Sequence, residues 1–104
     1  MIIQTRKPTH PGEILREEFM QDYNLSVAEL ANNLCVTRQS INALVHERRS
    51  VSPSMALRLG KFFGTTARYW LTLQMNYDIW STLQSDEETY NSITTVGEVQ
   101  ALQA

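Results

Sequence analysis

The fold is decided by LSVAELANNLCVTRQSINALV, residues 25–45. Ser26 and Glu29 fit a capping box, in which the serine hydroxyl accepts a backbone N–H while the glutamate reaches back to the cap. Thr37 is the next candidate cap, and apolar residues follow each cap at helical spacing. The stretch therefore predicts two short helices joined by about three residues.

Outward from this stretch, the chain predicts three more helices. Pro11 suits a first helical position, and Glu13 complements the positive helix start. Ser52 before a proline opens another helix, for which Gly64 is a natural left-handed stop. Trp70 lies in a run of apolar residues at spacings of three and four, and we expect it in the core. In chain order, the expected helices lie at about 11–22, 27–33, 38–45, 53–63 and 67–83.

The last residues of the chain form a tail whose structure the sequence leaves open. Ser85 precedes three acidic residues and could cap a further helix, whereas residues 92–96 (SITTV) read as a short strand. The chain has only four glycines and three prolines, which disfavours an all-β fold with many tight turns. We therefore expect an all-α protein with a five-helix domain at 1–83 and a short C-terminal tail at 84–104.

Length and composition exclude several classes of protein. A chain of 104 residues that is 42% hydrophobic and 19% charged is typical of one small globular domain. Its one cysteine, Cys35, excludes an internal disulfide, and His10 and His46 lack metal-ligand spacing. No apolar run approaches the roughly 20 residues that span a bilayer, and no signal-peptide core is present. We expect a cytoplasmic protein that contacts no membrane and binds no metal, cofactor or small-molecule substrate.

Charge is unevenly placed along the chain, although the net charge is only −2. Residues 37–61 carry five basic side chains against the single acid Glu47, whereas residues 62–104 carry five acids against Arg68. A basic patch on an acidic body can attract phosphate locally. The chain shows no nucleophile–base spacing and no phosphate-binding loop, so we expect a binding protein rather than an enzyme.

Two capped helices with so short a link form a helix-turn-helix, whose second helix can enter the DNA major groove. Near the start of this helix, Arg38 and Gln39 can pair bidentately with guanine and adenine, and Asn42 adds a second amide one turn on. Arg48 and Arg49 follow where the chain would leave the groove and meet backbone phosphates. Spacing alone leaves a second interpretation open, in which these polar residues are simply a solvated face.

Three stretches carry a resemblance to a known family. The segment LSVAELA, residues 25–31, followed by VTRQSI, residues 36–41, resembles the phage-repressor-like (XRE) helix-turn-helix family. HPGEIL at 10–15 and WLTLQMNYD at 70–78 make the chain similar to the HigA/VapI-type antitoxins within it. Together the three stretches span most of the chain, about residues 8–80.

The resemblance implies a sequence-specific DNA-binding antitoxin that acts as a homodimer on double-stranded operator DNA. Such a protein represses its own toxin–antitoxin operon and neutralises a HigB-type toxin, an mRNA endonuclease. By position, Arg38, Gln39 and Ser40 match the groove-facing residues of the family, and Thr37 matches a backbone-contacting place. We expect Ser26 to contact phosphate as well. The alternative is a stand-alone phage-type repressor without a toxin partner.

Two positions depart from the family pattern. Cys35 stands where the turn is commonly glycine, so a left-handed backbone there would be strained by about 1 kcal/mol. We expect the Cys35 side chain to be packed as a small buried hydrophobe. Val27 stands where many relatives have glutamine, so a contact from the first helix of the pair would be missing. Tyr77 and Trp80, late in the last helix, are candidates for a dimer interface.

Overall fold

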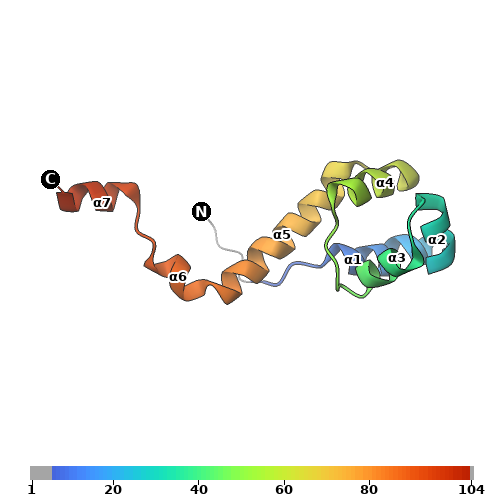
Figure 1. The fold of residues 1–104 in the computed structure, drawn as a ribbon, viewed down its shortest axis with the longest axis horizontal. Helices are drawn as coiled ribbons and strands as arrows, with labels where there is room; N and C mark the ends of the chain where they lie inside the picture. The colour runs from blue at the N-terminus through green and yellow to red at the C-terminus, as the bar shows by residue number, and fades with distance from the viewer. Residues whose placement is uncertain (1–5, 104) are drawn as a thin grey trace.

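The computed structural model describes residues 6–103 of the chain, and within that range it contains helices and no strand (Figure 1). This confirms the all-α class, although the helices outnumber the five expected. In order they are α1 (Pro11–Ile14), the π-helix η1 (Leu15–Met20), α2 (Val27–Leu34), α3 (Arg38–Val45), α4 (Pro53–Phe63), α5 (Ala67–Ser85), α6 (Glu87–Ser92) and α7 (Val96–Gln103).

The first helix differs from expectation in its middle. It runs without a break from Pro11 to Asp22, but Leu15–Met20 has π-helical hydrogen bonding. In a π-turn, residues five apart lie one above the other. Leu15 and Met20 are five apart and both are buried, so the wider turn lets both side chains reach the core.

The tail contains the further helix that the sequence left open, but not with Ser85 as its cap, and it does not contain the strand. Residues 92–96 do not form a strand: α6 ends within this segment and α7 begins there. Ser85 does not cap a helix, because it is the last residue of α5 and its hydroxyl donates to the Ser81 carbonyl at 2.9 Å. Asp86 precedes α6 instead, and the Thr95 hydroxyl accepts the Glu98 N–H at the start of α7. A short helix satisfies part of its own backbone hydrogen bonding, whereas a lone strand satisfies none of it.

One hydrophobic core joins α1, η1 and the helices from α2 to α5. Trp70 is completely buried in it, as expected, and its indole N–H donates to the Thr65 hydroxyl at 2.9 Å. Helices α6 and α7 bury no residue and extend the molecule to 63 × 21 × 21 Å, as Figure 1 shows at the red end of the chain. Across residues 6–103, no helix has both the length and the apolar character that a membrane crossing requires. The buried core residues are Leu15, Met20, Leu30, Ala31, Leu34, Ile41, Leu44, Val45, Val51, Met55, Ala56, Leu59 and Trp70.

Candidate nucleic-acid interface

The pair α2–α3 begins with the capping box that the sequence predicts. The Glu29 N–H donates to Ser26 Oγ and the Ser26 N–H donates to Glu29 Oε1, both at 3.1 Å. The backbone hydrogen bond from Ser26 is the main reason that the pKa of Glu29 lies below its usual value. The Ser26 hydroxyl is exposed but already accepts a hydrogen bond in the cap, so any phosphate contact from it would be additional.

The turn between the two helices agrees with one expectation for Cys35 and differs from another. Cys35 adopts the left-handed conformation that the glycine comparison predicts, with φ 58° and ψ 44°. The Val36 N–H then closes the helix end on the Ala31 carbonyl at 3.0 Å, a common C-terminal cap. The expectation that the Cys35 side chain is buried is wrong, because at this reversal of the chain it is exposed to solvent.

Helix α3 presents a polar face because its other face is fixed in the core. The Ser40 N–H donates to Thr37 Oγ1 at 3.1 Å, which caps the helix start. Three apolar residues of α3 are almost completely buried: Ile41, Leu44 and Val45. As a result, Arg38, Gln39 and Asn42 all point to solvent from the first turns of the helix.

The loop after α3 folds back on the start of the helix. Arg49 Nη1 donates to Ser40 Oγ at 3.0 Å, and Ser40 Oγ lies 2.8 Å from Thr37 Oγ1. Ser40 is half-buried, and its hydroxyl links Thr37 and Arg49 in this small network. Arg48 and Arg49 are exposed beside α3, so the structure brings the predicted phosphate-facing arginines next to the predicted base-facing side chains.

A small polar hollow of about 220 Å³ lies between α3 and the start of α4. Arg49 and Arg58 line it together with hydroxyls from Ser50, Ser52 and Ser54. Guanidinium and hydroxyl donors of this kind suit phosphate oxygens. The sequence identified Ser52 only as a helix cap and missed Ser54, because their grouping depends on how α4 crosses α3.

Two arginines hold the ends of α2 and α3 in place. Arg58 Nη1 donates to the Leu34 carbonyl at 2.7 Å, which satisfies the end of α2. Arg16, within the π-helix, donates to the Val45 carbonyl at the end of α3. Because the last carbonyls of a helix lack partners within it, these bonds fix both helix ends to the body of the molecule. The sequence counts Arg58 only as one charge of the basic patch. In the structure, the same guanidinium also holds the end of α2.

The two aromatic residues predicted for a dimer interface lie against the chain's own N-terminal segment. Tyr77 stacks edge-on against His10 with ring centroids 4.8 Å apart. Lys7 Nζ lies 5.9 Å from the Tyr77 ring and 5.8 Å from the Trp80 ring. Their role in a dimer stays a prediction, and the more exposed apolar face of α5 lies on the opposite side, at Met75 and Ile79.

The histidines have no metal-binding arrangement, since no group of three His, Cys, Asp or Glu side chains in residues 6–103 could hold an ion. His10 is the N-cap of α1 and its Nδ1 accepts the Gly12 N–H at 2.9 Å. Burial is the main reason that the pKa of His10 is lowered. His46 ends α3, with its Nδ1 2.8 Å from the Asn42 carbonyl oxygen.

Comparison with known proteins agrees with this geometry. Residues 17–70, which include α2, α3 and α4, match the helix-turn-helix family model. The HTH-type transcriptional regulator YbaQ of Escherichia coli K12 is 41% identical over 99 residues, which cover 93% of this chain and 88% of YbaQ. Virulence-associated protein I of Dichelobacter nodosus is 42% identical over 84 residues, covering 81% of this chain and 77% of that protein.

A solved structure extends the similarity to three dimensions. The Pseudomonas aeruginosa antitoxin HigA, solved with the higBA promoter, superposes with a TM-score of 0.83 at 37% identity. The superposition covers 86% of this chain and 99% of HigA. The chain thus belongs to the phage-repressor-like (XRE) helix-turn-helix family and, within it, to the HigA/VapI-type antitoxins.

Proposed function

We propose that this protein binds double-stranded operator DNA with the exposed face of α3 in the major groove. The observation that carries the proposal is the orientation of α3. Its apolar face is buried in the core, which leaves Arg38, Gln39 and Asn42 free at the helix start. Arginine pairs bidentately with guanine, and glutamine or asparagine with adenine, so this set can read base edges. HigA, a relative of known structure, was solved with promoter DNA.

The groups around α3 suit the DNA backbone. Thr37 lies at the helix N-terminus, where backbone N–H groups favour anions, and Ser40 and Arg49 lie beside it. Arg48 is exposed on the same loop, and Ser26 occupies the corresponding N-terminus of α2. We assign these residues to phosphate contacts, which set the register of the protein on the duplex, while the α3 face selects the sequence.

The protein would act as a homodimer at its own promoter. A symmetric dimer presents two α3 helices about 34–36 Å apart, which matches half-sites one helical turn apart on a pseudo-palindromic operator. Occupation of such a site represses the operon. This deduction requires a self-complementary surface elsewhere on the chain, because the α3 face is used by DNA.

Neutralisation of a HigB-type mRNA endonuclease is the second part of the proposal, and it rests on family membership. A toxin that acts on RNA is expected to be basic, and residues 62–104 carry five acids against one arginine. The alternative of a stand-alone regulator is favoured by the name of YbaQ, which describes a transcriptional regulator. Co-expression with the adjacent reading frame separates the two: an antitoxin co-purifies with a small basic protein and relieves its toxicity, whereas a stand-alone repressor does neither.

Gel-shift titration on the chain's own promoter tests the DNA interface. Arg38→Ala and Gln39→Ala should each lose roughly 1–3 kcal/mol of operator affinity and relax specificity at one base position. Gln84→Ala, an exposed glutamine near the end of α5, is the matched control and should bind as the unmodified chain does. Unchanged operator binding by both α3 variants would remove base reading from this helix.

A further inference from the structure

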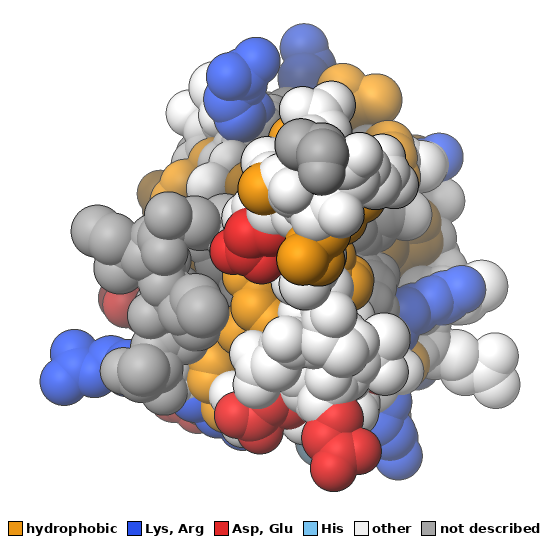
Figure 2. All heavy atoms as spheres, turned by 90° about the vertical axis from the view of Figure 1, so that its left-hand side faces the viewer, with side chains coloured by type: hydrophobic (Ala, Val, Ile, Leu, Met, Phe, Trp, Pro, Cys, Tyr) orange, Lys and Arg blue, Asp and Glu red, His pale blue; other side chains and the backbone are white. Residues whose placement is uncertain are grey.

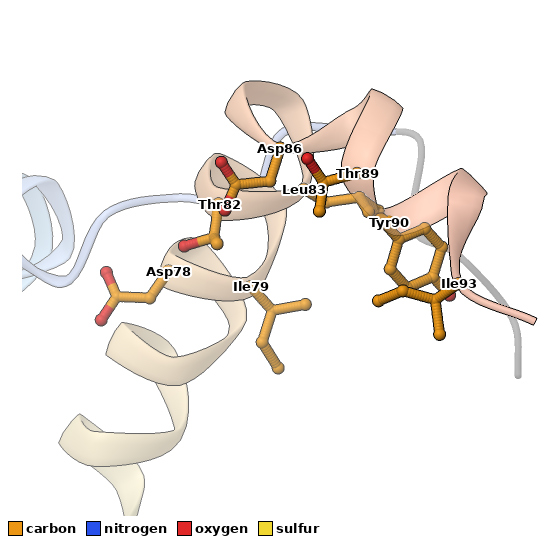
Figure 3. Close-up of a pocket in the computed structure, with 8 residues that line it drawn as sticks. All are labelled: Asp78, Ile79, Thr82, Leu83, Asp86, Thr89, Tyr90 and Ile93. Atoms are coloured by element: carbon orange, nitrogen blue, oxygen red, sulfur yellow. The ribbon is translucent and has the colours of Figure 1, made fainter.

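Two hollows outside the α3 face differ in the charge of their walls. The first, of about 450 Å³, lies between the end of α5 and α6 (Figure 3). Figure 3 shows Asp78 on the side of Ile79 that faces away from Tyr90, and Asp78 already accepts a hydrogen bond from Gln74 at 2.9 Å. Figure 2 looks at the molecule from this end and shows hydrophobic side chains grouped with acidic ones, while lysines and arginines project near the rim. Apolar side chains, rather than free charges, dominate this first hollow.

The second hollow, of about 390 Å³, lies between the end of the first helix and the start of α5. The ring of Phe19 lies 5.0 Å from the buried ring of Trp70 and 6.3 Å from the ring of Tyr69, between centroids. The core therefore holds this wall in place without any partner. Acids and aromatic rings share the lining, and we call the site the η1 hollow: Glu17, Glu18, Phe19, Asp22, Tyr23 and Tyr69.

The carboxylates of the η1 hollow are not neutralised by the chain itself. Among residues 6–103 the only ion pair joins Arg16 and Glu17 at 2.9 Å, so Glu18 and Asp22 have no basic partner in that range. Burial raises the pKa of Tyr69, and the nearby charge of Glu18 raises it further, since both disfavour a phenolate. The hollow therefore combines negative potential with exposed aromatic faces.

Asp22 also lies at the wrong end of its helix for stability. It is the last helical residue of the unbroken run from Pro11, and no basic residue lies in the last turn of η1. The C-terminal end of a helix carries a partial negative charge, so a carboxylate there is unfavourable and a cation is favourable. Helix stability does not account for an acid at this position, whereas a positively charged partner does.

We propose that the η1 hollow binds an arginine or lysine side chain of the basic toxin. The inference rests on the proposed function, which supplies the toxin, and adds the surface that holds it. A guanidinium stacks on aromatic faces and donates paired hydrogen bonds to carboxylates, and both kinds of group meet in this hollow. Arg16 reaches the Val45 carbonyl at the end of α3, whereas Phe19 of the same helix packs toward α5. Toxin and operator DNA therefore use different sides of the protein.

Charge selects this occupant over the alternatives. Nucleic acid is anionic and would be repelled by the carboxylates of the η1 hollow. A second copy of the chain, placed on the hollow by a two-fold axis, would set acids against acids, because such an interface uses the same patch twice. An uncharged apolar partner would desolvate Glu18 and Asp22 without pairing them. A cationic side chain avoids all three penalties.

Isothermal titration of the full chain with the basic protein encoded in the adjacent reading frame tests the hollow. Glu18→Arg and Asp22→Arg should each weaken binding roughly tenfold or more, because an attractive contact becomes repulsive. Asp22→Arg should also raise the thermal unfolding midpoint, since a cation suits the helix C-terminus. Weaker binding by a more stable protein excludes misfolding as the cause.

A pair of variants at one exposed ring tests the aromatic part of the contact. Tyr23 is 62% exposed, so its replacement leaves the core intact. Tyr23→Leu should weaken binding roughly two- to fivefold, whereas Tyr23→Phe keeps the aromatic face and should bind as the unmodified chain does. Equal affinities of these two variants would overturn the stacking contact.

Controls separate the hollow from a general effect of charge. Glu88→Arg and Glu98→Arg make the same reversal at exposed positions in α6 and α7 and should bind within about twofold of the unmodified chain, because distant charges are screened by salt. Equal weakening by these controls, or unchanged binding by Glu18→Arg and Asp22→Arg, would overturn this inference alone. A basic product that is missing from the adjacent frame, or that does not bind, would overturn the toxin part of the proposed function as well. Gel shifts with Arg38→Ala test operator binding separately.

Discussion

The α2–α3 unit and the α5–α7 end of the molecule place their apolar side chains in opposite ways. In α2 and α3, Leu30, Ile41 and Leu44 are almost completely buried by the chain itself. In α7, by contrast, Val96 is 73% and Leu102 is 88% exposed, and neither α6 nor α7 buries any residue. One end has therefore completed its packing, whereas the other leaves apolar side chains exposed to solvent.

The difference shows where each region obtains its structure. Caps at Ser26 and Thr37 and the carbonyl bonds from Arg16 and Arg58 fix α2 and α3 before any ligand arrives. A fixed helix loses little conformational entropy on binding, which suits the reading of a rigid duplex. At the α5–α7 end, by contrast, α6 and α7 bury no residue.

The largest effect should come from removing a side chain on which the completed core depends. Trp70→Ala should lower the free energy of unfolding by about 3–5 kcal/mol, because it leaves a cavity among η1, α4 and α5 and ends the bond to Thr65. Leu102→Ala should change it by less than about 0.5 kcal/mol. Urea denaturation measures both, and similar losses would contradict the contrast between the two ends.

A pair of glycines sharpens the comparison. A Cβ at Gly12 would lie 1.8 Å from the Leu44 carbonyl oxygen, so Gly12→Ala must push α1 away from α3. We expect a loss of about 1–3 kcal/mol in the free energy of unfolding. Gly97→Ala in α7 is the control: its nearest neighbour would be 3.9 Å away, and alanine favours a helix by up to about 1 kcal/mol. Equal thermal stability of the two variants would mean that α1 can move freely against α3.

Variants of two arginines near α3 should distinguish a residue that contacts phosphate from one that holds a helix end in place. Arg48→Ala should reduce the slope of log affinity against log salt by about 0.9, because one phosphate contact is lost. Arg58→Ala should weaken operator binding by roughly 1 kcal/mol through loosening of the α2 end, with the slope unchanged. Gel shifts at several salt concentrations provide the measurement, and a reduced slope for Arg58→Ala would place its guanidinium on a phosphate.

The smallest effect concerns pH and the contact between α1 and α5. Burial lowers the pKa of His10 below 6.5, and its Nδ1 accepts a hydrogen bond, so the folded state favours the neutral ring. The contribution of His10 to stability is therefore fully present above pH 6.5 and is lost as the pH falls through the folded-state pKa. His10→Asn keeps a capping acceptor that does not titrate, so its unfolding free energy should fall less on acidification. An identical pH dependence for both chains would exclude His10 as the cause.

Local signals account for the features that the sequence predicted well. The helix caps at Ser26, Thr37 and Ser52 each accept a hydrogen bond from a backbone N–H three residues on. The left-handed helix end at Gly64 needs no distant contact. The apolar period of α3 also assigns its buried face, from which the exposure of Arg38 and Gln39 follows. The family resemblance, carried by short motifs, was confirmed by the relatives.

Features that depend on distant contacts were predicted poorly or missed. The exposure of Cys35 and the π-turn that brings Leu15 and Met20 inward have no local signal in the sequence, and the cover of Tyr77 by His10 joins segments far apart in the chain. The apolar residues at 92–96 were read as a strand, because a short run does not by itself distinguish a strand from a helix end.

The order of residues along the chain determined the helix starts and stops, the all-α class and the polar face of α3, because these depend on neighbours within one turn. Tertiary structure alone decided that Arg16 and Arg58 hold helix ends, that four serines and Arg49 line one hollow, and that Met75 and Ile79 of α5 stay exposed. Such outcomes depend on how helices cross, and crossing is set by packing of the whole core rather than by any local sequence signal.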